Sequence, residues 1–150
     1  MPSPRPMDLA FAAAEAAAAR GEVPVGAVIV DAATGTVLAS AGNRTEELCD
    51  PSAHAELLAI RAACAERRQP RLPGCDLYVT LEPCALCAAA ISFARIRRVY
   101  YGAYDPKGGA VDHGPRFFTQ ATCHHAPEVY SGIGETRASL LLRDFFRKRR

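Results

Sequence analysis

Four side chains with metal-binding or proton-transfer chemistry occur in two short groups, His54 with Glu56 and Cys84 with Cys87. The two cysteines are three residues apart directly after Pro83, at the expected start of a helix. Residues three apart share one face of a helix, so both sulfurs emerge on the same side of its first turn. The helix N-terminus also favours the thiolate, which is the form that binds metal. This spacing predicts part of a metal site.

The segments between these two groups indicate where a further ligand comes from. Residues 52–68 have helical periodicity, residues 76–82 have the composition of a strand, and residues 84–96 are again helical. In a right-handed β-α-β arrangement both helix starts reach the same edge of the sheet. We therefore expect His54 to join the two cysteines.

The expected ligand set of one nitrogen and two sulfurs leaves the fourth position of a tetrahedral zinc for water, as in catalytic sites. Zinc lowers the pKa of bound water to about 7, and the resulting hydroxide attacks electron-poor carbons. Glu56 lies two residues beyond His54, near the expected metal but not needed as a ligand. We predict that Glu56 takes the proton of the water and delivers it to the substrate.

Two other interpretations of the cysteine pair stay open. A C-x-x-C motif at a helix start also suits redox chemistry. A closed structural zinc site would need a fourth protein ligand, and the available candidates are His113, Cys123, His124 and His125. The presence of His54 and Glu56 at matching distances favours the catalytic interpretation. No separate role is assigned to His124 or His125.

The remaining segments complete an α/β pattern, and Ser52 is a plausible N-cap of the helix over 52–68. The other expected elements are a helix over 7–18, strands over 23–31, 36–43 and 97–103, a short segment over 128–133 and a helix over 135–150. This alternation predicts a three-layer α/β/α fold around a central mixed sheet, with parallel neighbours in its β-α-β part. We interpret residues 1–150 as one domain.

The composition limits the classes of protein that the chain can be. At 150 residues, with 49% hydrophobic and 23% charged residues, it is an ordinary globular sequence. The alanine-rich start contains Glu15 and reads as a helix rather than a signal peptide, and no apolar run approaches the ~18 residues of a membrane span. We expect a cytoplasmic protein with no membrane partner. Its six cysteines are then thiols or metal ligands rather than disulfides.

The charge is unevenly distributed along the chain. Residues 1–75 carry 7 basic and 9 acidic side chains, whereas residues 76–150 carry 11 and 7. The last eight residues, "RDFFRKRR", contain five basic residues and one acidic residue, a pattern that attracts phosphates. Because cations also suit a helix C-terminus, this tail fits either nucleic-acid binding or a solvated helix end.

The spacing of the two motifs resembles the signature of the cytidine/deoxycytidylate deaminase superfamily. "HAE" at 54–56 is followed by 26 residues and then by "PCALC" at 83–87. The resemblance implies the cytidine deaminase-like fold with a five-stranded sheet and one Zn²⁺ held by His54, Cys84 and Cys87. It also implies that Glu56 is the general acid/base of a hydrolytic deamination from which ammonia leaves.

Further matches make the chain similar to the bacterial tRNA-specific adenosine deaminases, and they extend almost from end to end. They are "GEVPVGAV", "GNRT", "DPSAHAE", "LYVTLEPC", "ARIRRVYYGAYDPKGGA", "CHHAPEV" and "LLRDFFRKRR". That family converts adenosine to inosine at the wobble position of a tRNA anticodon stem-loop, as a homodimer. The resemblance implies that Asn43 contacts the flipped adenosine, that Val23 walls its pocket and that Glu22 lies near the neighbouring nucleotide. From the sequence pattern alone, Asn43 would be a turn residue, Val23 a core residue of a strand and Glu22 a solvated side chain.

The same resemblance places the end of the final helix beside the RNA. The candidate contacts there are Phe145, Phe146, Arg147 and Arg149. The two phenylalanines follow Leu141 and Leu142 at helical spacing, so we expect at least one of them to pack into the core. Some relatives carry arginine where this chain has Tyr104, so no RNA contact is assigned to Tyr104.

Three functions are compatible with this sequence. The leading one is zinc-dependent deamination of adenosine in tRNA. The second is deamination of a free base or nucleoside such as guanine, cytosine or cytidine, which the basic tail and the near full-length match disfavour. The third is a non-catalytic zinc subunit that binds RNA. Glu56 argues against this last function, because a structural zinc site needs no acid/base beside it.

Overall fold

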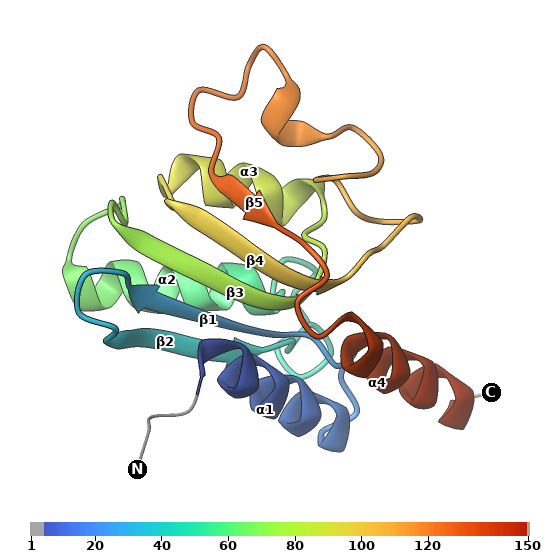
Figure 1. Cartoon of the computed structure of the whole chain (residues 1–150). Helices are drawn as coiled ribbons and strands as arrows, with labels where there is room; N and C mark the ends of the chain where they lie inside the picture. Colours follow the sequence, from blue (N-terminus) through green and yellow to red (C-terminus); the bar gives the residue numbers. More distant parts are fainter. Residues whose placement is uncertain (1–4, 150) are drawn as a thin grey trace.

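The computed structural model describes residues 5–149, whose five strands form one sheet (Figure 1). In chain order the strands are β1 (Gly26–Asp31), β2 (Val37–Gly42), β3 (Cys75–Leu81), β4 (Arg98–Ala103) and β5 (Glu128–Tyr130). They lie in the order β2-β1-β3-β4-β5. β1 is antiparallel to both β2 and β3, whereas β3, β4 and β5 are parallel. The expected five-stranded mixed sheet is confirmed.

Helices cover both faces of this sheet (Figure 1). Helices α1 (Pro6–Ala19) and α4 (Glu135–Lys148) pack on one face, and α2 (Ala55–Arg67) and α3 (Ala85–Phe93) pack on the other. The side chains of β1 alternate accordingly, with Val28 in the core under α1 and Ile29 in the core under α2. The fold therefore has the three α/β/α layers that the sequence predicts. Arg150, the last residue of the predicted final helix, lies outside the described residues.

Gly26 allows α1 to lie against the central strand β1. A Cβ at this position would lie 1.9 Å from the backbone oxygen of Ala10 and 2.6 Å from the nitrogen of Ala14. A side chain at position 26 would therefore force helix and strand apart. This close approach fixes the start of β1 near the end of the sheet that carries the candidate site.

The expectation of parallel neighbours is correct for β3 with β4 and wrong for the strands that flank α2. β1 lies between β2 and β3 and is antiparallel to each of them. The short turn after β1 pairs it with β2 on one side, and β3 then buries its other edge. Because β2 and β3 are both antiparallel to β1, they still run in the same direction. The two helices that follow them therefore begin at the same edge of the sheet.

Two local details differ from the sequence-based expectation. α3 ends at Phe93 rather than at residue 96, since Arg95 adopts a left-handed conformation with φ of 61°. The long segment before β5 contains a short 3₁₀ helix at Phe117–Thr119, which the sequence pattern does not predict. Within residues 5–149 there is no helix with the length and apolar content needed to cross a membrane.

Candidate metal centre and substrate cavity

Three metal-binding atoms meet where α2 and α3 begin. His54 directly precedes α2, Cys84 directly precedes α3, and Cys87 lies in the first turn of α3. His54 Nδ1 is 3.5 Å from Cys84 Sγ and 3.4 Å from Cys87 Sγ. Typical Zn–S and Zn–N bonds at a tetrahedral angle would separate nitrogen and sulfur by about 3.6 Å. The three residues therefore have both the donor types and the spacing that suit Zn²⁺.

Asn43, rather than Ser52, caps the helix that presents His54. α2 begins at Ala55, and the backbone N–H of Ala55 donates a hydrogen bond of 3.3 Å to Asn43 Oδ1. Asn43 directly follows the last residue of β2. The expectation that Ser52 caps this helix is therefore wrong. Asn43 is buried, and its side chain fixes the start of α2 relative to the sheet. The direction of His54 thus depends on a residue eleven positions earlier.

The two sulfurs differ in their protonation. Hydrogen bonding with Cys87, and also with His54, lowers the pKa of the Cys84 thiol to about 4. The bond with Cys84, together with burial, raises the pKa of Cys87. Cys84 is therefore the more acidic thiol of the two. A zinc ion held by both sulfurs would bind them as thiolates.

Glu56 lies in the first turn of α2 and is 4% exposed. Burial raises the pKa of its carboxyl to about 7. A group with this pKa can both accept and release a proton near neutral pH. Its position on the same turn as His54 places it beside the three ligands.

A cavity of about 190 Å³ opens at this point. Its lining residues come from the starts and ends of several elements and are Val23, Val25, Asn43, His54, Glu56, Leu81, Glu82, Cys84, Asp105 and Gly108. The structure thus brings together Val23, Asn43 and Glu56, which the sequence analysis singled out separately. A small, partly apolar cavity with metal ligands and the buried acids Glu56 and Glu82 suits the binding of a flat ring beside a metal ion.

Comparison with known proteins identifies the chemistry of this cavity. The family model for the cytidine and deoxycytidylate deaminase zinc-binding region matches residues 3–103. A tRNA-specific adenosine deaminase of Agrobacterium fabrum is 62% identical over 144 residues, covering 96% of this chain and 93% of that protein. The chain belongs to the tRNA-specific adenosine deaminases. The metal of the His54, Cys84 and Cys87 cluster is therefore zinc.

Two solved structures of similar proteins share the fold of this chain. One from a study of A-to-I editing by tRNA:A34 deaminases at the wobble position has a TM-score of 0.89 and 62% identity, covering 91% of this chain and 98% of that chain. A guanine deaminase of Bacillus subtilis has a TM-score of 0.63 and 37% identity, covering 69% of this chain and 66% of that chain. The cytidine deaminase-like fold expected from the sequence is confirmed.

The candidates for a fourth protein ligand make other contacts in this deaminase. His113 Nδ1 is 2.8 Å from Glu82 Oε1, Cys123 Sγ is 3.5 Å from Ser92 Oγ, and His125 Nε2 is 2.7 Å from the backbone oxygen of Ile96. His124 lines a different cavity, near the end of α3. In the described part of the chain, residues 5–149, the one cluster able to hold a metal consists of His54, Cys84 and Cys87.

Glu22 is buried rather than solvated. Its carboxylate accepts backbone hydrogen bonds from Glu46 at 3.1 Å and from Glu47 at 2.8 Å. It therefore shapes the turn after β2 instead of lining the cavity. Tyr104, to which no role was assigned, hydrogen-bonds through its hydroxyl to Ser131 at 2.8 Å.

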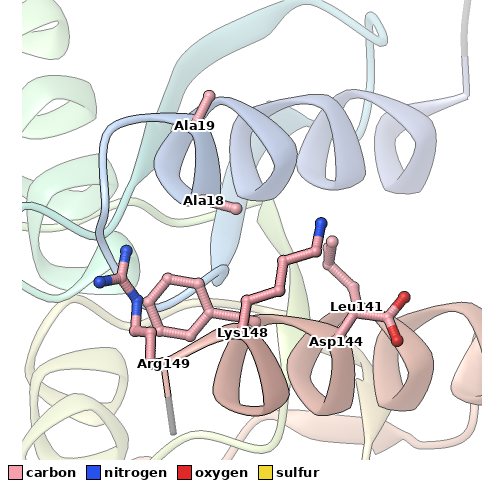
Figure 2. Close-up of a pocket in the computed structure, with 7 residues that line it drawn as sticks. Ala18, Ala19, Leu141, Asp144, Lys148 and Arg149 are labelled. Atoms are coloured by element: carbon pink, nitrogen blue, oxygen red, sulfur yellow. The ribbon is translucent and has the colours of Figure 1, made fainter.

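The residues predicted at the end of α4 divide into two kinds. Phe145 is buried and has the Arg149 guanidinium 4.3 Å above its ring, whereas Phe146 and Arg147 are exposed. The expectation that at least one phenylalanine packs inward is confirmed. Figure 2 shows Lys148 and Arg149 projecting from α4 towards α1, in a second cavity of about 450 Å³ whose wall includes Ala18. None of these residues lines the metal cavity.

Five residues of the cavity were not predicted from the sequence, namely Val25, Leu81, Glu82, Asp105 and Gly108. Val25 and Leu81 are apolar residues in or next to strands, where a core position is the ordinary expectation. A signal for Glu82 was present, since an acidic residue at the carboxyl end of a buried strand lies where α/β folds place their sites. Asp105 and Gly108 belong to an irregular segment, for which the sequence pattern gives no position in space.

Proposed function

We propose that this chain converts adenosine to inosine at the wobble position of a tRNA anticodon. The observation that carries this proposal is the cavity in which Glu56 lies beside the three zinc ligands. The substrate class follows from membership of the tRNA-specific adenosine deaminases. An anticodon base can be splayed out of its loop and inserted into such a cavity.

In the proposed mechanism Glu56 moves the protons. Zinc, when bound, supplies a water activated for attack on the amino-bearing carbon of the ring. The Glu56 carboxylate accepts a proton from this water and delivers it to the substrate, so that water is consumed and ammonia leaves. A pKa of about 7 suits both halves of this transfer. His54, Cys84 and Cys87 hold the metal and stay unchanged.

Asn43 and Val23 are the residues that we propose to hold the base. The Oδ1 of Asn43 is used by the backbone of Ala55, so its amide N–H groups are the ones that can donate to the adenine ring. Val23 supplies apolar surface to the same cavity. A polar contact on one side and an apolar wall on the other can orient a purine relative to Glu56.

The exposed end of α4 is the proposed contact for the rest of the anticodon stem-loop. Phe146 offers a ring for stacking and Arg147 offers charge for phosphates. Phe145 and Arg149 support these residues through their own stacking contact. Glu22 acts indirectly in this proposal, because its carboxylate fixes the turn at Glu46 and Glu47, which would contact the neighbouring nucleotide.

We further propose that the chain acts as a cytoplasmic homodimer of one catalytic domain per subunit. The exposed apolar residues Leu86 and Phe93 lie seven positions apart on α3, so they share one face of that helix. Phe93 is 74% exposed, so this face of α3 offers apolar surface that a second subunit would cover. The single continuous sheet supports one domain.

The deciding experiment measures inosine formation by the purified zinc enzyme. The substrates are an unmodified tRNA with adenosine at the wobble position, the same tRNA with guanosine there, free adenosine, guanine, cytosine and cytidine. We expect inosine in the first tRNA alone. Turnover of guanine with the tRNA untouched would favour the activity of the guanine deaminase neighbour instead. Zinc and tRNA binding with no turnover of any substrate would identify a non-catalytic subunit.

A further inference from the structure

Glu82 follows the last residue of β3, and its carboxylate is completely buried beside the metal centre. Its backbone N–H donates to the oxygen of Ala103 at 2.9 Å, so the end of β3 is held to the end of β4. Only Pro83 separates it from the zinc ligand Cys84. A buried carboxylate needs several hydrogen-bond donors to replace its lost hydration.

The donors to this carboxylate come from one segment, residues 105–113. Oε1 accepts from the backbone of Asp105 at 2.9 Å and lies 2.8 Å from His113 Nδ1. Oε2 accepts from the backbone N–H groups of Val111, Asp112 and His113 at 3.2, 2.9 and 3.2 Å. One side chain therefore ties both ends of the segment to the end of β3.

The fit between this segment and Glu82 depends on Gly109. A Cβ at Gly109 would lie 2.5 Å from the carboxyl carbon of Glu82 and 2.6 Å from its Oε2. A side chain at this position would therefore displace the carboxylate. The next residue, Ala110, donates its N–H to the backbone oxygen of Pro83 at 2.9 Å. The segment is thus attached to the strand-helix junction through a side chain and through the backbone.

The segment also forms a wall of the substrate cavity. Asp105 and Gly108 line the cavity together with His54, Glu56 and Cys84. Asp105 Oδ1 accepts the N–H of Gly108 at 3.0 Å, which holds the turn between the two. Displacement of a positioning group by about 1 Å can lower a rate by about 100-fold. The placement of this wall is therefore relevant to the reaction.

We propose that Glu82 is a positioning residue for adenosine deamination, which fixes residues 105–113 as a preformed wall of the base cavity relative to the zinc ligands. The inference rests on the proposed use of this cavity for adenosine. Both oxygens of the side chain must accept hydrogen bonds at once. Glutamine cannot do this, because its NH₂ group would face the N–H of Asp105 or those of residues 111–113.

The test compares Glu82→Gln with Asp76→Asn. Asp76 is a matched control, because it is also a buried carboxylate of β3 but lies at the end of the strand away from the cavity. The Arg97 guanidinium donates hydrogen bonds of 2.9 and 2.7 Å to its two oxygens. For each variant we would measure zinc content, melting temperature, and kcat and KM for inosine formation in tRNA. The affinity for tRNA would be measured in the inactive Glu56→Gln background.

We expect Glu82→Gln to keep its zinc and its tRNA affinity while kcat falls by about 10- to 100-fold, the size expected for a misplaced reacting group. Asp76→Asn should lower the melting temperature and leave kcat unchanged. A further expected result is that Glu82→Asp does not rescue kcat, because its shorter side chain keeps the charge but cannot reach both sets of donors.

An unchanged kcat in Glu82→Gln, or an equal loss of kcat in Asp76→Asn, would overturn the proposal. If Glu82→Gln does not fold, His113→Ala removes one of the five contacts and leaves the carboxylate in place. That variant should lower kcat several-fold, and an unchanged kcat would again overturn the proposal. A wild-type enzyme without activity on tRNA would instead contradict the proposed function.

Discussion

The metal cavity and the exposed end of α4 are built in opposite ways. The cavity is lined by residues from separate parts of the chain, next to β1, β2, β3, α2 and α3 and in the segment after β4. Hydrogen bonds to other elements hold its polar residues Asn43 and Glu82 in place. The end of α4 presents Phe146 and Arg147 from one helix to solvent. A bond-forming step requires fixed distances, whereas attraction to phosphates acts over roughly 10 Å at ordinary salt. We therefore expect substitutions in the cavity to affect rate and those in α4 to affect affinity.

The largest expected effect is that of Cys87→Ala. Loss of one of three ligands should abolish zinc binding and activity, and lower the melting temperature, because binding of metal contributes to folding. Zinc content by atomic emission, thermal melting and inosine formation would be measured together. Cys49→Ala is the control, since Cys49 is exposed and outside the ligand cluster. Zinc bound at full stoichiometry in Cys87→Ala would show that the ligand set is wrong.

Glu56→Gln should separate catalysis from structure. The variant is expected to bind one zinc and to keep its tRNA affinity, while kcat falls by about 10²- to 10⁴-fold because the proton shuttle is lost. Single-turnover inosine formation with excess enzyme would measure this. Activity close to that of the wild type would refute the role of Glu56 and weaken the distinction between cavity and tail.

Asn43 should show both a structural and a catalytic effect. Asn43→Ala removes the cap of α2 and the proposed base contact, so stability should fall by about 1 kcal/mol and kcat/KM by about 10- to 100-fold. Asn43→Asp retains the acceptor for Ala55 but lacks the amide donor, so it should recover stability and not activity. Thermal melting and kinetics on the same samples would distinguish the two. Full activity of Asn43→Asp would remove Asn43 from base recognition.

Arg147→Ala should have the smallest effect, confined to binding. We expect a several-fold weaker affinity for tRNA and an unchanged kcat. The slope of log affinity against log salt concentration should fall by about 1, as expected for the loss of one phosphate contact. Arg137→Ala is the matched control on α4, because Arg137 pairs with Glu15 on α1 at 3.1 Å. Affinity would be titrated at several salt concentrations. A loss of kcat in Arg147→Ala would show that the end of α4 also positions the base.

Features of the structure that depend on residues close together in the sequence could be predicted, whereas features that depend on distant residues could not. The motifs around His54 and Cys84 lie at helix starts, where local spacing determines which way a side chain points, so the ligands could be predicted. The position of β1 between β2 and β3 could not, because pairing partners distant in sequence leave no local pattern. The hydrogen bonds of Glu82 are hidden for the same reason, since backbone donors carry no sequence signal.

Which strands are neighbours in the sheet was predicted less well than the direction in which each strand runs. The β-α-β pattern predicted adjacent parallel strands around α2, which is wrong, yet the helix starts meet as expected because β2 and β3 share a direction. For a site at one edge of a sheet, the direction of each strand matters more than its neighbour. This explains why the site could be predicted more accurately than the topology that holds it.

The order of strands across the sheet has a consequence for synthesis on the ribosome. After the β1-β2 hairpin, each later strand joins the same free edge, first β3, then β4, then β5. No strand has to insert between two that are already paired. The residues that line the metal cavity all precede residue 109, and α4 begins at Glu135. The topology thus allows the catalytic half of the molecule to assemble while the helix proposed to contact tRNA is still being made.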